Sequence, residues 1–92
     1  FERVDAREID KYYSDHSYEI VELSEAPTNH DDRIKFIPVG EIVERSRYEL
    51  DSKKTIVFNC AKAEMQLACQ FAAGSLARNG YRVIAAGLAR HL

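Results

Sequence analysis

Four short hydrophobic runs along the chain predict β-strands. The runs are rich in β-branched and aromatic residues, and polar or turn-forming residues bound them. The predicted strands are 18–23, 34–37, 55–58 and 81–85. The run 55–58 is apolar on both faces, as expected of a central strand in a parallel sheet. Residues 26–32, which contain Pro27 and Asn29, are predicted to form a loop.

Amphipathic stretches predict three helices, at about 4–13, from 38 to about 50, and at 64–78. In the first helix, Asp5 can accept hydrogen bonds from the free N–H groups of the first turn, and Glu8 has the spacing of a capping box. Val4 and Ile9 have the spacing of a hydrophobic staple. Pro38 suits the start of the second helix, because the missing N–H group costs nothing there.

The helix at 64–78 is predicted to bury an apolar stripe against the sheet. The stripe consists of Leu67, Ala68, Phe71, Ala72 and Leu76. Asn79 and Gly80 are expected to end this helix, since glycine readily adopts a positive φ at a helix C-terminus.

Strands that alternate with helices indicate an α/β fold with a mainly parallel central sheet of about four to five strands, flanked by helices. A chain of 92 residues is expected to form a single domain, 1–92. Because the first residue is Phe1 rather than Met, we expect a trimmed form or a piece of a longer chain.

Composition excludes several classes of protein. Thirteen Lys and Arg against 15 Asp and Glu give a net charge of −2, without the basic excess of a nucleic-acid-binding protein. No apolar run approaches the ~20 residues of a membrane span, and no secretory signal is expected, since the first segment alternates charges. Two cysteines are too few for a disulfide scaffold, so we expect a reduced, cytoplasmic setting. The two cysteines also lack the close His or Cys partners of a zinc site, so we expect no bound metal.

Cys60 is the residue most indicative of chemistry. It directly follows the predicted central strand and precedes a helix, and ligands of open α/β folds bind at the carboxyl ends of strands. Backbone N–H groups and a helix N-terminus at that place would lower the pKa of the thiol and favour a nucleophilic thiolate. The alternative is that Cys60 is a small buried hydrophobic residue, as free cysteines often are. Position alone leaves both interpretations open.

Several segments resemble the rhodanese-like sulfurtransferase family, and the resemblance covers nearly the whole chain. The run Ile56-Val57-Phe58-Asn59-Cys60 is similar to the strand that leads into the persulfide cysteine of that family. Ala72-Ala73-Gly74-Ser75-Leu76, followed by Asn79-Gly80-Tyr81, is similar to the end of the next helix. Other segments with family counterparts are 22–25, 29–30, 36–42 and 82–88.

This resemblance implies the same fold and a covalent mechanism. In such domains the cysteine, here Cys60, takes a sulfane sulfur from a small donor such as thiosulfate or a persulfide. It then passes the sulfur to a thiol or protein acceptor, without a cofactor. A fused or partner redox or sulfur-relay domain is expected, whereas nucleic acid and membrane partners are not. The residues that match the substrate-binding loop of the family are Ala61, Lys62, Ala63, Glu64 and Met65.

The loop departs from the family pattern. It has neither the glycine nor the terminal arginine of the family, and the distance from Cys60 to the Ala72–Ala73 pair is about three residues longer. Lys62 could attract an anionic donor with its ammonium charge, but it cannot form the two parallel hydrogen bonds that an arginine guanidinium group makes. Glu64 would repel a dianion if it faced inward, but in a first helical turn it would be favoured by the helix dipole.

Two functions therefore stay open. The first is an enzyme, a sulfurtransferase or persulfide carrier, in which Cys69 is either a resolving thiol or a packed helix residue. The second is a non-catalytic rhodanese-like interaction or regulatory module with a degenerate loop. A cysteine phosphatase ranks last, because no arginine lies between Cys60 and Arg78 to hold the oxyanion.

Overall fold

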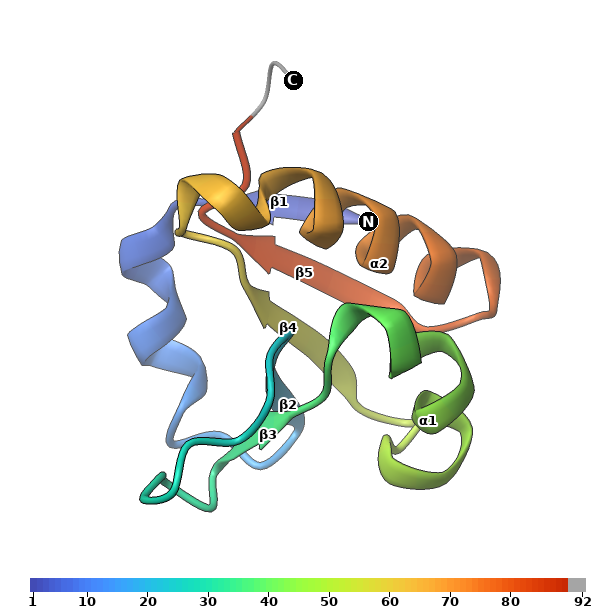
Figure 1. The fold of residues 1–92 in the computed structure, drawn as a ribbon, viewed down its shortest axis with the longest axis horizontal. Coiled ribbons are helices and arrows are strands. Elements are labelled where there is room, and N and C mark those ends of the chain that lie inside the picture. Colours follow the sequence, from blue (N-terminus) through green and yellow to red (C-terminus); the bar gives the residue numbers. More distant parts are fainter. Residues whose placement is uncertain (90–92) are drawn as a thin grey trace.

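In a computed structural model that describes residues 1–89, the chain folds around one five-stranded sheet (Figure 1). The strands are β1 (Glu2–Val4), β2 (Tyr18–Glu22), β3 (Ile34–Phe36), β4 (Thr55–Asn59) and β5 (Arg82–Ala86). They lie in the order β1-β5-β4-β2-β3, and every neighbouring pair is parallel. The predicted α/β class and parallel sheet are therefore confirmed, and β4 lies at the centre of the sheet as predicted.

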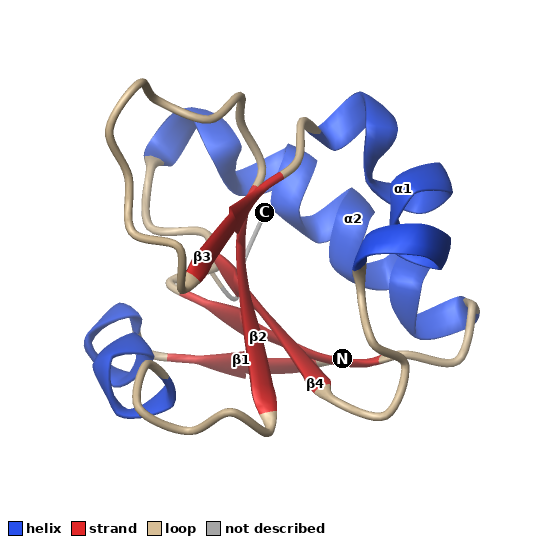
Figure 2. Ribbon diagram, turned by 90° about the horizontal axis from the view of Figure 1, so that it is seen from below, coloured by secondary structure: helices blue, strands red, loops and turns tan. Residues whose placement is uncertain are grey.

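Helices cover both faces of the sheet. They are η1 (Ala6–Tyr12), η2 (Val39–Glu41), α1 (Ile42–Glu49), η3 (Ala63–Met65) and α2 (Gln66–Arg78), where η marks a 3-10 helix. Figure 2 shows α1 and α2 on one side of the strands and η1 on the other. Within residues 1–89, no helix has the length and apolar character that a membrane crossing needs.

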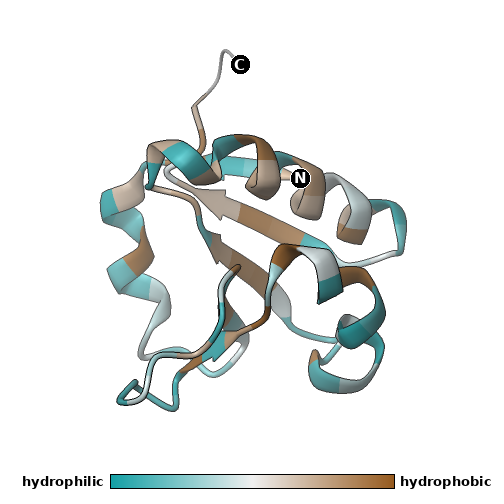
Figure 3. Cartoon of the chain, viewed as in Figure 1, coloured by the Kyte–Doolittle hydropathy of each residue, from teal (hydrophilic) through white to brown (hydrophobic). Residues whose placement is uncertain are grey.

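Alternation along the strands builds two apolar layers. From β4, Ile56 and Phe58 face the layer under α1 and α2, whereas Val57 joins Ile20 and Ile84 in the layer under η1. The three β4 side chains are fully buried, and Figure 3 shows hydrophobic colour concentrated on the central strands. Burial on both faces is what a central parallel strand requires.

The first strand and the first helix differ from their predicted forms. Residues 2–4 form β1, which the sequence analysis did not predict because three residues carrying two charges show no strand pattern. The capping box is confirmed: the Asp5 carboxylate accepts the Arg7 N–H at 2.9 Å, and the Glu8 carboxylate accepts the Asp5 N–H at 3.1 Å. The helix that follows is a 3-10 helix, with an i to i+3 pattern.

The predicted buried stripe of α2 is wrong in two positions. Leu67 is 73% exposed and Phe71 is 58% exposed. Small side chains face the core instead, and because they are small they let the helix lie close to the sheet. The fully buried residues of α2 are Cys69, Ala72, Ala73 and Leu76, while Ala68 is half-buried.

Glycine ends α2 as predicted. Gly80 has a φ of 93°, its N–H donates to the Ala77 carbonyl at 3.1 Å, and the Tyr81 N–H donates to the Leu76 carbonyl at 3.0 Å. This pair of bonds is a Schellman motif, which satisfies the last carbonyl groups of the helix before β5 begins.

Arg33 fastens the loop before β3 to the end of η1. Its guanidinium donates to the backbone carbonyls of Tyr13 at 2.8 Å, Asp15 at 2.6 Å and Tyr18 at 3.1 Å, with a longer bond to Tyr12 at 3.3 Å. One side chain thus satisfies carbonyl groups that the end of a short helix leaves free.

Candidate functional site

The carboxyl ends of β2, β4 and β5 meet at one edge of the sheet, where the predicted loop begins. There the Asn59 side-chain amide donates to the Glu22 carboxylate at 2.7 Å, which joins the ends of β4 and β2. On the other side, the Cys60 N–H donates to the Ala86 carbonyl at 2.8 Å and continues the pairing with β5. Ligands of open α/β sheets bind at this kind of edge.

A pocket of about 230 Å³ opens between the ends of β2 and β4. The predicted loop supplies Ala61, Lys62, Glu64 and Met65 to its lining, whereas Ala63 is exposed outside it. The remaining lining residues are Glu22, Leu23, Ser24 and Asn59. The structure therefore brings four of the five predicted loop residues to one pocket.

The charges around this pocket are mixed. Lys62 supplies one ammonium group, while Glu22 and Glu64 supply two carboxylates. Glu64 lies in the first turn of η3, where the sequence analysis expected it, and it also lines the pocket. Ser24, in the segment 22–25 that has a family counterpart, lines the pocket and adds no charge.

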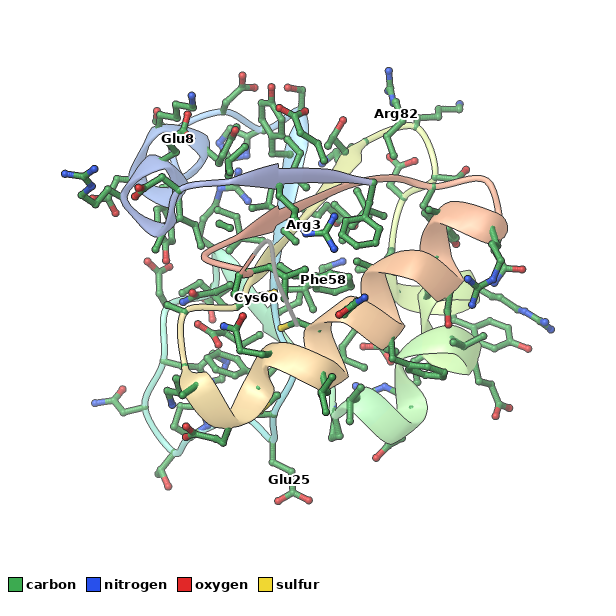
Figure 4. All side chains as sticks on the ribbon, turned by 90° about the horizontal axis from the view of Figure 1, so that it is seen from above. Arg3, Glu8, Glu25, Phe58, Cys60 and Arg82 are labelled. Carbon is green, nitrogen blue, oxygen red and sulfur yellow. The ribbon has the colours of Figure 1, made fainter. Side chains whose placement is uncertain are left out.

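Cys60 lies beneath this edge rather than in the pocket lining. Its side chain is fully buried, and it continues the alternation of Ile56 and Phe58 toward α2. In Figure 4, Cys60 and Phe58 lie in the interior, whereas the labelled Glu8, Glu25 and Arg82 project from the periphery. Met65 packs against the same apolar cluster and also lines the pocket, so it contacts both.

Cys69 lies in the same part of the core as Cys60. Both thiols are free and buried, and both belong to one apolar cluster. The Cys69 Sγ lies 3.9 Å from the carbonyl oxygen of Asn59, the residue before Cys60. Cys69 is thus packed in the core near the end of β4, and a resolving role for it stays a prediction.

The two cysteines shift each other's ionisation. Interaction with Cys69 raises the pKa of Cys60, and burial and the Glu22 charge raise it further. The same interaction lowers the pKa of Cys69, against the opposing effect of burial. The expectation that the loop lowers the pKa of Cys60 is therefore wrong, because this thiol is fully buried and has a second thiol nearby.

Gln66 connects two backbone segments, the start of the loop after β4 and the turn after β5, and no sequence-based prediction included it. Its side-chain Nε2 donates to the carbonyls of Cys60 at 2.6 Å and Gly87 at 3.2 Å, while its Oε1 accepts the Ala89 N–H at 2.6 Å. No sequence pattern distinguishes Gln66 from the second glutamine of α2, Gln70. The bonds themselves join residues up to 23 positions apart and depend on the strand order.

His30, in the segment 29–30 that has a family counterpart, packs at the end of β3 and is not among the residues that line the pocket. Its ring packs against Phe36 with centroids 4.9 Å apart, and its Nδ1 lies 3.1 Å from the Pro27 carbonyl. Among residues 1–89, no three His, Cys, Asp or Glu side chains are grouped as ligands of a metal ion.

The chain has a rhodanese-like α/β fold, as a comparison of structures shows. It is similar to the crystal structure of the rhodanese homolog TT1651 from the extremely thermophilic bacterium Thermus thermophilus. The TM-score is 0.66 at 20% identity, over 94% of this chain and 93% of that chain. No protein-family model and no curated protein matches the sequence. The predicted resemblance is thus confirmed for the fold.

Proposed function

We propose that this domain is a sulfur carrier that receives a sulfane sulfur on Cys60 and passes it to a thiol acceptor. The observation that carries the proposal is the place of Cys60, which directly follows the central strand of a rhodanese-like sheet and lies next to a pocket. The similar solved structure is described as a rhodanese homolog, which agrees with this class of activity. In the thiolate form, a cysteine attacks the outer sulfur of a donor and holds it as a persulfide.

The pocket charges favour a persulfide donor over thiosulfate. Thiosulfate is a dianion, and family members hold it with a guanidinium group that this loop lacks. Here one ammonium group, on Lys62, faces two carboxylates, on Glu22 and Glu64. An alkyl persulfide carries less charge, and its alkyl part fits a lining to which Leu23 and Met65 contribute apolar surface.

Loading Cys60 requires access to a buried thiol. Met65 lies against both the pocket and the cluster that holds Cys60, and methionine side chains change rotamer readily. Displacement of Met65 is therefore the route that we propose for the donor. A Met65→Ala variant shortens this route and is expected to react faster with a small alkylating agent at Cys60.

The test is sulfur loading read by intact mass. Reduced protein is incubated with thiosulfate or with a low-molecular-weight alkyl persulfide, as wild type, Cys60→Ser and Met65→Ala. We expect the persulfide to modify the wild type and, faster, Met65→Ala. Cys60→Ser should stay unmodified at that site, and thiosulfate should react several-fold more slowly. A Glu64→Gln variant should raise the rate with thiosulfate, and Lys62→Gln should lower it.

A non-catalytic interaction module is the second candidate, and a different observation favours it. Leu67 and Phe71 lie one turn apart on α2, and both are mostly exposed, although large apolar side chains on a helix are ordinarily buried. Such a surface suits contact with a partner protein. If neither donor loads the wild type or Met65→Ala, and Cys60 resists alkylation in the folded state of both, the sulfur-carrier proposal fails and the module is the better account.

A further inference from the structure

The two buried thiols form a pair that a sulfur carrier does not need for loading. One cysteine is enough to hold a persulfide, yet Cys69 points from the first turns of α2 toward the end of β4. Its Sγ lies 3.9 Å from the carbonyl oxygen of Asn59, the residue before Cys60. Both side chains are fully buried in the same cluster, so the two thiols are sheltered from bulk thiols.

We propose that Cys69 resolves the persulfide on Cys60 by attacking its inner sulfur, which releases hydrosulfide and leaves a Cys60–Cys69 disulfide. This inference rests on the proposed loading of Cys60 and adds an activity to it, persulfide-dependent release of sulfide. A dithiol reductant then returns the disulfide to two thiols and completes the cycle.

The steps balance in atoms and electrons. In loading, Cys60 Sγ bonds to the outer sulfur of the alkyl persulfide, the donor S–S bond breaks, and the donor leaves as its thiol with the Cys60 proton. In resolution, Cys69 Sγ bonds to Cys60 Sγ, the bond to the carried sulfur breaks, that sulfur leaves as hydrosulfide with its own proton, and the Cys69 proton is released to solvent. The carried sulfur is reduced, and the two cysteine thiols are oxidised to the disulfide.

The burial of the pair favours this route whenever no acceptor thiol has reached Cys60. A thiol held in the same cluster as Cys60 attacks without a bimolecular encounter, which gives intramolecular reactions their large advantage. An external acceptor has first to pass Met65 to reach the same sulfur. A resolving role also accounts for a cysteine, rather than another alanine, on the small-residue face of α2 that includes Ala72 and Ala73.

The test compares wild type with Cys69→Ala, which keeps the buried face of α2 small and apolar. Both proteins receive a limiting amount of alkyl persulfide, and intact mass and released sulfide are followed in time. The wild type is expected to lose the mass of two hydrogens and to release one sulfide per disulfide. Cys69→Ala is expected to gain one sulfur atom stably and to release several-fold less sulfide.

The outcomes separate this inference from the proposed function. If Cys69→Ala loads sulfur and the wild type keeps the same added sulfur equally long, Cys60 is a carrier and the resolving role is overturned. If neither protein gains or releases sulfur, the proposed function fails and the inference fails with it. Treatment of the wild type with an oxidised small dithiol gives an independent readout. Peptide mapping must then find a Cys60–Cys69 link, and a chain that stays fully reduced overturns the inference even if Cys69→Ala does not fold.

Discussion

Gly87 leaves room for the first residue of the loop. A methyl group on its α-carbon would lie 2.9 Å from the Cα of Ala61 and 3.0 Å from its backbone nitrogen, which is closer than such contacts occur. Gly87 also has a φ of 89°, a conformation that side chains disfavour. The turn after β5 and the loop after Cys60 therefore fit together only with glycine at this position.

Gly87→Ala is expected to destabilise the domain by about 2–4 kcal/mol, because it adds steric overlap to the cost of a positive φ. The free energy of unfolding in urea measures this. Gly80→Ala is the matched control, since Gly80 has a φ of 93° but open space around it, and its expected cost is about 1 kcal/mol. Equal losses in the two variants would contradict the close contact with Ala61.

Arg33 is expected to contribute more to stability than an exposed arginine. Arg33→Met leaves several backbone carbonyls near the end of η1 without a donor, which should cost about 2–3 kcal/mol of unfolding free energy. Arg33→Lys should recover only part of this, since an ammonium group lacks the planar fork.

Arg82→Met serves as the control for this series. Arg82 is exposed, and its guanidinium donates to the Lys53 carbonyl at 3.0 Å. Its loss should change the free energy of unfolding by about 0.5 kcal/mol. A cost at Arg33 as small as that at Arg82 would show that water satisfies the carbonyls equally well.

The orientation of α2 is testable by truncating side chains on its two faces. Leu76→Ala should cost about 2–5 kcal/mol, because Leu76 is fully buried. Leu67→Ala and Phe71→Ala should each change the free energy of unfolding by about 0.5 kcal/mol or less, since these side chains are mostly exposed. A large loss at Leu67 would mean that the helix is rotated toward the stripe that the sequence pattern predicted.

Stability should fall as the solution is acidified through the pKa of the capping carboxylates. The hydrogen bond from Arg7 lowers the pKa of Asp5, and the hydrogen bond from Lys11 lowers that of Glu8. A carboxyl group whose pKa is lower in the folded protein than in the unfolded chain stabilises the fold at any pH above its unfolded pKa. This stabilisation is lost as the pH falls through the folded pKa. The melting temperature should therefore drop between about pH 5 and pH 2.5.

Asp5→Asn isolates the charge from the cap in this titration, because asparagine is an equally good N-cap. Its melting temperature should depend less on pH in the acid range than that of the wild type. Asp5→Ala removes both and should be less stable at every pH, by about 1 kcal/mol at neutrality. An Asp5→Asn variant with the pH dependence of the wild type would contradict a lowered Asp5 pKa.

Local patterns predicted most of the fold. The run 55–58 indicated a central strand, and the capping box of Asp5 and Glu8 and the glycine at 80 placed helix ends correctly. The pattern failed at β1, whose three residues become a strand only because β5 pairs with them. It also failed on α2, where the large apolar side chains of Leu67 and Phe71 were expected to be buried. Because α2 packs close to the sheet, mainly small side chains fit between them.

The candidate site was predicted in its residues but not in its electrostatics. The order of strand, cysteine and loop placed Lys62, Glu64 and Met65 at one pocket. The pKa of Cys60 depends on Cys69 and Glu22, whose positions beside it follow from helix orientation and strand order. The Gln66 bonds to Gly87 and Ala89 likewise depend on tertiary structure, so no spacing along the chain could have shown them.

The strand order determines when the sheet can be completed during synthesis on the ribosome. β5 lies between β1 and β4, so residues 2–4 acquire their partners 84–86 only after all four other strands have been synthesised. Until then β1 has no partner strand and β4 lacks its neighbour on one side. The pairing of β5 with β1 and β4 is therefore a late, long-range step, which slows folding. Until this step, the incomplete chain exposes unpaired strand edges that favour aggregation.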